Sequence, residues 1–275
     1  MARFSRIAPL LPLAVLAASA AAQNTPPANP PPPTTAPAAA RDLPEAAAVI
    51  DRAIKAHGGP EALASITSLQ YVITTEQPGS TSTFRVRAAP PDKTLITIDG
   101  TTRMEFGRNG DIAWRHDAAT GFALIPESQL GQVTRLHPLG LVMRLPSYRD
   151  RAVTADHATV GDHPCLKLRL PSTQGEVFLY FDDETGLVRG LEEIRANASA
   201  RIALMTTFED ERAVAPLTIF HLATMSFGGQ ALGALKLSDV RYNTLDPELF
   251  AVPAEVAALA RTSRPTTAPA GVNDQ

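Results

Sequence analysis

Apolar residues recur at every second position along most of the chain. Leu69, Tyr71 and Ile73 form one such set, and the same period of two is found around Phe84 and Met104. Further segments with this pattern lie at residues 95–98, 166–170, 177–181, 187–194, 202–208, 217–223 and 235–242. A period of two predicts strands with one covered face, and many such segments in succession predict an antiparallel sheet. We therefore expect a curved sheet of about ten strands.

Short turn signals separate these segments. Asp117–Gly121 and Asp182–Gly186 both begin with aspartate and end with glycine, which suits a hairpin turn that needs a positive φ. Asn109-Gly110 and Gly228-Gly229 are two further hairpin signals, and Val160-Gly161-Asp162 is a third. The strands are therefore expected to follow one another as hairpins.

Helical patterns occur at two places. After Pro44 the apolar residues Val49, Ile50, Ala53 and Ile54 fall on one helical face, and His57-Gly58-Gly59-Pro60 ends the pattern. A short turn is expected at Glu61–Ile66, and a second helical segment at 127–136. The predicted fold class is α+β, mainly β, with helices packed on the concave face of the sheet.

The two ends of the chain differ from the part between them. Residues 1–22 combine Arg3 and Arg6 with the apolar run from Ile7 to Ala18 and an Ala-Ala-Ala ending, which is typical of a cleaved secretory signal. Residues 23–41 are rich in proline and predict an extended, disordered linker. The folded domain is expected at 42–258 and a disordered tail at 259–275. These features predict an exported, periplasmic protein of a bacterium.

Composition excludes several classes of partner. The formal net charge is −3, and loss of the signal with its two arginines makes it more negative, so we expect no nucleic-acid partner. No second apolar run reaches the length of a membrane span, so we expect no transmembrane segment in the mature chain. Cys165 is the sole cysteine and lies in an alternating segment, which favours a buried structural thiol over a reactive one.

The sequence contains no recognisable catalytic, metal or cofactor motif. The histidines lack the spacing of metal ligands, and Asp182-Asp183-Glu184 coincides with a predicted turn. There is no nucleophile elbow, P-loop or dinucleotide fingerprint. We therefore expect a protein that is not an enzyme and that has no cofactor. Trp114, the sole tryptophan, is either a core aromatic or part of the lining of an apolar cavity.

An ordered set of stretches resembles the superfamily of LolA and LolB, the periplasmic carrier and receptor of outer-membrane lipoproteins, and in particular the outer membrane lipoprotein-sorting proteins. The stretches are the opening helix with His57-Gly58-Gly59, Gly110–Trp114, Tyr180–Leu187, Phe208–Glu211 and Asp239–Pro253. The resemblance implies a half-open β-barrel with helices on its concave face, enclosing an apolar cavity for acyl chains. It also implies an interior arginine that holds the helical lid, for which Arg85, Arg87 and Arg103 are candidates.

These inferences predict a protein that binds a hydrophobic ligand, an acyl chain or a lipoprotein, as a carrier in the cell envelope. The alternative is an envelope sensor or scaffold that uses the same fold to bind a protein partner. The residues expected to contact the ligand are apolar positions of the predicted strands: Tyr71, Phe84, Met104, Phe106, Trp114 and Phe178. Substitution Phe84→Glu is expected to weaken ligand retention and to leave the domain folded.

Overall fold

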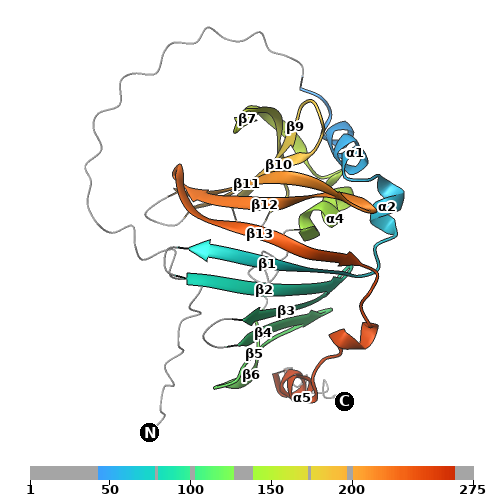
Figure 1. The fold of residues 1–275 in the computed structure, drawn as a ribbon, viewed down its shortest axis with the longest axis vertical. Coiled ribbons are helices and arrows are strands. Elements are labelled where there is room, and N and C mark those ends of the chain that lie inside the picture. The colour runs from blue at the N-terminus through green and yellow to red at the C-terminus, as the bar shows by residue number, and fades with distance from the viewer. Residues whose placement is uncertain are drawn as a thin grey trace, which may run out of the picture. The chain divides into compact units, whose positions relative to one another are not determined.

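A single antiparallel sheet of thirteen strands dominates the part of the chain that the structure describes (Figure 1). The structure is a computed structural model that describes residues 43–77, 80–99, 103–126, 139–172, 175–196 and 201–263. The strands are β1 (Leu69–Gln77), β2 (Ser80–Ala89), β3 (Lys93–Asp99), β4 (Met104–Asn109), β5 (Ile112–Asp117), β6 (Gly121–Leu124), β7 (Val153–Val160), β8 (His163–Leu170), β9 (Glu176–Asp182), β10 (Val188–Ala196), β11 (Arg201–Val214), β12 (Leu217–Phe227) and β13 (Gln230–Tyr242).

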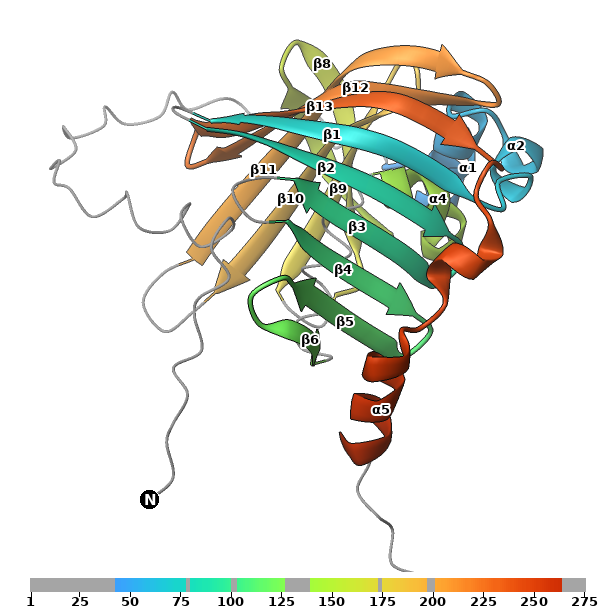
Figure 2. The ribbon, with the colours of Figure 1, turned by 60° about the horizontal axis from the view of Figure 1, so that its bottom comes forward.

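The order of the strands explains why the barrel is half open. Successive strands pair with one another from β1 to β6 and from β7 to β13, and β1 also pairs with β13. The sheet therefore ends at β6 on one side and at β7 on the other, and these two edge strands do not pair. Figure 2 shows the sheet curving strongly between its edges, with helix α4 (Leu139–Tyr148) inside the curve. The predicted curved antiparallel sheet is confirmed, although it has more strands than the ten expected.

Five helices accompany the sheet in the described residues: α1 (Ala46–Ala56), α2 (Pro60–Ala64), α4 (Leu139–Tyr148), the 3₁₀ helix η2 (Pro247–Phe250) and α5 (Ala254–Ser263). The predicted opening helix and the short turn after it are confirmed as α1 and α2. The helix expected at 127–136 lies outside the described residues. Helix α5 continues past residue 258, where the sequence analysis places the end of the domain.

Helix α1 buries its apolar face and contacts α4, and the residue that follows the helix, His57, joins it to the sheet. Val49, Ile50, Ala53 and Ile54 are all buried, as the 3.6-residue period predicts. Beyond the helix, the ring of His57 is 1% exposed and makes two hydrogen bonds to the sheet. Its Nδ1 lies 2.8 Å from the carbonyl oxygen of Thr218, and its Nε2 lies 3.3 Å from the backbone nitrogen of Val188. Because a backbone N–H must donate to Nε2, the proton of the neutral ring is on Nδ1.

The register of the sheet assigns side chains to its two faces. Residues directly opposite each other in an antiparallel pair point to the same face. Tyr71 is opposite Val86, which is opposite Ile96, which is opposite Phe106. The Tyr71 hydroxyl is hydrogen-bonded to the backbone of Leu139, the first residue of α4. The face that carries Tyr71 is therefore the face that α4 covers, and we call it the concave face.

The C-terminal segment contacts the other end of the sheet. Helix η2 contacts β3 and β4, and α5 contacts β6. The Asn109 side chain donates a 2.9 Å hydrogen bond to the carbonyl oxygen of Phe250, which is 2% exposed. Val256 of α5 is fully buried. This segment therefore belongs to the folded domain.

The predicted turns are confirmed. Asn109 and Ile112 are opposite each other at the β4–β5 turn, and Phe227 and Gln230 at the β12–β13 turn. Cys165 is fully buried on β8, as expected for a structural thiol, and burial raises the pKa of its thiol to about 11. Within the described residues, no helix combines the length and the apolar character that crossing a membrane would need.

Candidate functional site

The concave face carries two neighbouring rows of apolar side chains. The first row is Tyr71, Val86, Ile96 and Phe106, of which none is more than 9% exposed. The second row is Ile73, Phe84, Ile98 and Met104. Phe84 is 6% exposed and Met104 is half-buried. Four of the six residues predicted to contact a ligand, namely Tyr71, Phe84, Met104 and Phe106, therefore share this face.

The apolar concave face continues onto β11, β12 and β13, where its burial falls along the strands. Phe208 is opposite Ala223, and both are nearly inaccessible at 2% and 0% exposure. Met225, two residues further along β12, is half-buried, and Phe227 at the end of that strand is 39% exposed.

Strand β11 shows the same gradient. Leu204, directly opposite Phe227, is half-buried, and Ile202 is 37% exposed. Helix α1 lies at the other end of these strands, because His57 hydrogen-bonds to Thr218 (Figure 1). The concave face therefore has a sealed end near α1 and an end with accessible apolar side chains at the β12–β13 turn.

Trp114 lies on the opposite face. It is directly opposite Gly107 on β4, whereas its neighbour Arg115 is opposite Phe106. A Cβ atom placed on Gly107 would meet the indole ring at 2.1 Å, so the ring lies against the Gly107 backbone. Trp114 is 3% exposed, on the part of the sheet that η2 and α5 contact. The structure thus separates Trp114 from Phe106, although the sequence analysis grouped the two.

Phe178 also lies away from the concave face. Register links its neighbour Leu179 through Leu191 and Thr206 to Met225 on the concave face, so Phe178 points the other way. Phe178 packs in a small buried cluster with Val160, Cys165 and Tyr180.

Polar groups cover this small cluster. Lys167 Nζ lies 4.1 Å from the centre of the Phe178 ring and 2.7 Å from Glu192 Oε2. The Tyr180 hydroxyl lies 2.6 Å from the same carboxylate oxygen. Phe178 is therefore enclosed by side chains of its own face.

The candidate interior arginines are not on the concave face. Arg85 is opposite Val72 and Thr97, and Arg87 donates a 2.6 Å hydrogen bond to the Thr97 hydroxyl. Thr97 neighbours Ile96 and Ile98 in the strand, so all three polar residues point to the opposite face. Arg103 has a largely exposed side chain that pairs with Glu105. Two other arginines, Arg108 and Arg115, do share the concave face, because Arg108 is opposite Ala113 and Arg115 is opposite Phe106.

A buried polar cluster lies at the β9–β10 turn. One oxygen of the Asp182 carboxylate accepts hydrogen bonds from the backbone N–H groups of Glu184 and Thr185. The other oxygen accepts from Arg189 Nε at 3.1 Å and lies 2.9 Å from His163 Nδ1. Although burial opposes ionisation, these donors hold the pKa of Asp182 at about 2. Arg189 also pairs with Glu211. The predicted turn is confirmed, and its aspartate fixes the turn and the start of β10.

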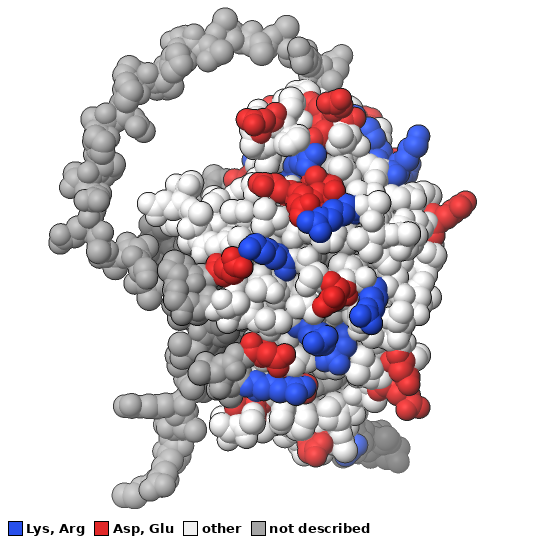
Figure 3. All heavy atoms as spheres, in the orientation of Figure 1, with Lys and Arg blue, Asp and Glu red and all other residues white. Residues whose placement is uncertain are grey.

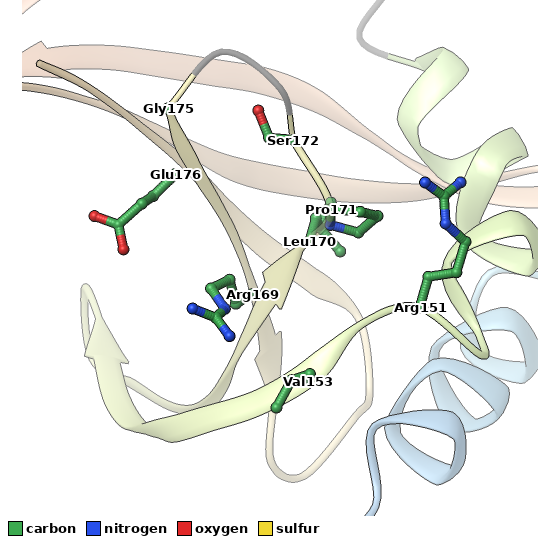
Figure 4. Close-up of a pocket in the computed structure, with 8 residues that line it drawn as sticks. All are labelled: Arg151, Val153, Arg169, Leu170, Pro171, Ser172, Gly175 and Glu176. Atoms are coloured by element: carbon green, nitrogen blue, oxygen red, sulfur yellow. The ribbon is translucent and has the colours of Figure 1, made fainter.

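A hollow of about 300 Å³ lies at the ends of β7, β8 and β9 (Figure 4). It is lined by Arg151, Val153, Arg169, Leu170, Pro171, Ser172, Gly175 and Glu176. The side chains of Arg151 and Arg169 lie on opposite sides of Leu170 and Pro171 and extend away from each other. They therefore do not converge on one point as an anion clamp would. None of the six predicted ligand-contacting residues lines this hollow.

Charged side chains are mixed on the face shown in Figure 3. Acidic and basic side chains are interspersed over the described part of that face. Exposed ion pairs of the sheet include Lys236 with Glu76 and Arg212 with Asp210. Within the described ranges, no three His, Cys, Asp or Glu side chains are grouped so that they could hold a metal ion. The features that distinguish the site are therefore its apolar lining and the two arginines on β4 and β5, Arg108 and Arg115.

Solved structures of other proteins have a similar fold. The sequence matches no protein-family model and no curated protein. The structure is similar to a DUF1329 family protein from Desulfovibrio piger, with a TM-score of 0.55 and 12% identity over 76% of this chain and 98% of that one. It is also similar to a LolA superfamily protein from Nitrosomonas europaea, with a TM-score of 0.54 and 13% identity over 76% and 99% of the two chains. The expectation from the sequence is confirmed at the level of fold: this chain has a LolA-like fold.

Proposed function

We propose that the protein binds a hydrophobic ligand, an acyl chain or the acylated part of a lipoprotein, on the concave face of its sheet. We further propose that it does so as an exported carrier in the bacterial cell envelope. The observation that carries the proposal is the gradient on β11 and β12, where apolar side chains of one face pass from buried to accessible. Phe208 is 2% exposed, and Phe227 is 39% exposed on the same face.

The accessible end of the concave face has the chemistry of an acyl-chain site. Ile202, Leu204, Met225 and Phe227 offer aliphatic, thioether and aromatic groups. Removing apolar surface from water stabilises a complex by about 25 cal/mol per Å². A ligand that covers these side chains buries apolar surface of its own and of the protein, and both contribute to binding. Each buried methylene of an acyl chain contributes about 0.8 kcal/mol.

Carrier function requires release as well as binding. A ligand moves from one protein to another, or to a membrane, when its affinity for the acceptor is modestly higher. Accessible apolar residues at one end of the concave face provide a route by which a chain can leave without unfolding the sheet. The LolA-like fold and the secretory signal predicted at residues 1–22 support the same proposal.

The first experiment is native mass spectrometry of the mature protein isolated from an envelope extract, followed by organic extraction. The proposal predicts a stoichiometric acylated species. An empty protein that also rejects fluorescent fatty-acid probes contradicts it. An empty protein with a stable protein partner favours the alternative, a sensor or scaffold with this fold.

A matched pair of variants on β12 tests the face. Met225 and Thr224 are adjacent and both half-buried, but Met225 points to the concave face and Thr224 to the other. Met225→Glu is expected to weaken binding of a fluorescent fatty-acid probe roughly tenfold or more, because a carboxylate would then line an apolar site. Thr224→Glu is expected to leave binding within about twofold of the unmodified protein. Equal effects of the two variants contradict the assignment of the site to this face.

A further inference from the structure

Arg115 continues the first apolar row of the concave face. Tyr71, Val86, Ile96, Phe106 and Arg115 are successive directly opposed residues on β1 to β5. Strands in a sheet are about 4.8 Å apart, so the backbone of Arg115 lies about 19 Å from that of Tyr71 when measured along the curved sheet. The row therefore places a positive charge at the far end of an apolar strip.

The residues directly opposite Arg115 on this face are uncharged. They are Phe106 on β4 and Ala123 on β6. Ala113, two residues earlier on the same strand, is 2% exposed. Arg108 on β4 lies diagonally across from Arg115 on the same face, and its Nε donates a 3.0 Å hydrogen bond to the carbonyl oxygen of Gly110. Arg115 itself is half-buried. Its guanidinium carries five N–H donors and a positive charge.

The described residues provide no counter-ion for Arg115. None of them forms a hydrogen bond or ion pair with its guanidinium. Asp117 is on the same face, opposite Met104, but no ion pair joins it to Arg115. One Asp117 carboxylate oxygen accepts a 2.7 Å hydrogen bond from the backbone N–H of Ala119 in the β5–β6 turn. Asp117 therefore fixes that turn. Other arginines of the sheet do have partners, such as Arg189 with Asp182 and Glu211.

We infer that Arg115 binds the anionic headgroup of the ligand whose apolar tail lies along the concave face. The inference rests on the proposed function and gives it a ligand class, an amphiphile with a carboxylate or phosphate at one end. A half-buried guanidinium next to Phe106 is less hydrated than one in water, so a charge-assisted hydrogen bond to an acid is favourable there. A neutral headgroup of the same size gains no such bond.

Displacement of a neutral fluorescent probe, N-phenyl-1-naphthylamine, tests the inference with three competitors of equal chain length: hexadecanoic acid, hexadecyl phosphate and hexadecanol. The unmodified protein is expected to bind one or both acids roughly tenfold more tightly than the alcohol. The acid that shows the larger preference identifies the headgroup as carboxylate or phosphate. Arg115→Gln is expected to abolish the preference while affinity for hexadecanol stays within about twofold, and Arg115→Lys to retain part of it.

Arg85→Gln is the matched control, because Arg85 lies on a neighbouring strand but points to the opposite face. It is expected to leave the preference unchanged. If hexadecanol and both acids bind equally to the unmodified protein, or if Arg115→Gln keeps the preference, this inference is overturned and the proposed function stands. If no competitor and no probe binds, both are overturned. A thermal unfolding midpoint of Arg115→Gln within a few degrees of the unmodified protein shows that the change acts on binding.

Discussion

The indole ring of Trp114 lies directly against the backbone of Gly107, the residue opposite it on the neighbouring strand. A Cβ atom at Gly107 would be 2.1 Å from two carbons of the ring, which is closer than van der Waals contact permits. Gly107→Ala is therefore expected to displace the indole or the strand and to lower the free energy of unfolding by about 1–3 kcal/mol. Urea unfolding measures the change.

Gly190 provides the control for Gly107. A Cβ atom there would meet Met205 at 2.6 Å, but at the terminal carbon of a flexible side chain that can turn aside. Gly190→Ala is expected to cost less than Gly107→Ala. A smaller residue at position 114, as in Trp114→Leu, is expected to reduce the cost of Gly107→Ala, because the clash is removed. Additive effects of the two changes would contradict the contact.

We expect the free energy of unfolding to fall in mild acid because of His57. Burial lowers the pKa of its imidazole below 6.5, and the ring accepts a hydrogen bond from Val188 only while Nε2 has no proton. The unfolded chain therefore binds a proton at His57 more readily than the folded one. Stability is highest above the unfolded pKa and falls as the pH drops from about 7 through the lower folded pKa. Unfolding free energies of the unmodified protein and of His57→Gln between pH 8 and 5 measure this, and parallel profiles would contradict it.

We expect a second fall in the free energy of unfolding at lower pH, because of Asp182. Its pKa is about 2 in the folded protein and its ordinary value is 3.8, so the stability that its carboxylate contributes is complete above pH 4 and is lost between about 4 and 2. Asp182→Asn turns an acceptor of Arg189 into an amide and is expected to cost about 2–4 kcal/mol. Asp183→Asn is the control: its carboxylate lies 3.8 Å from His157 on the surface, and we expect about 0–1 kcal/mol. Similar losses for both variants would contradict the role of the buried cluster.

The strands and turns could be predicted because they depend on local signals. The period of two marked β1, β2, β8 and β9, and glycine with Asn or Asp marked the β4–β5, β5–β6 and β9–β10 turns. Strand β7 was missed because its residues Thr154–Thr159 are mostly polar and exposed, so no alternation shows. Helix α4 was missed because its apolar residues are spread around it and Pro146 lies within it.

The candidate site could be predicted only in part because alternation says which residues share a face within one strand but not which face is concave. Tyr71, Phe84, Met104 and Phe106 belong together because β1 to β4 pair in a particular register. Trp114 points to the other face from Phe106, because Arg115 and not Trp114 is directly opposite Phe106 in the β4–β5 hairpin. Phe178 lies on β9, which is far from β1 in the strand order. The same register places Arg115 on the concave face, directly opposite Phe106. Long-range pairing fixed these relations, and no local pattern in the chain encodes them.

Phe84 and Phe227 share the concave face but differ in burial, and this difference changes the expected outcome for Phe84. Phe84 is 6% exposed between Ile73 and Ile98, whereas Phe227 is 39% exposed at the end of β12. A carboxylate at position 84 would have no accessible path to water, so Phe84→Glu is now expected to abolish cooperative unfolding. Phe227→Glu is expected to leave the thermal midpoint within a few degrees and to weaken fatty-acid probe binding roughly tenfold, while Ser226→Glu on the opposite face leaves binding unchanged. A folded Phe84→Glu variant with weakened binding would show that the ligand reaches β2, and a Phe227→Glu variant with full affinity would remove the β12 end from the site.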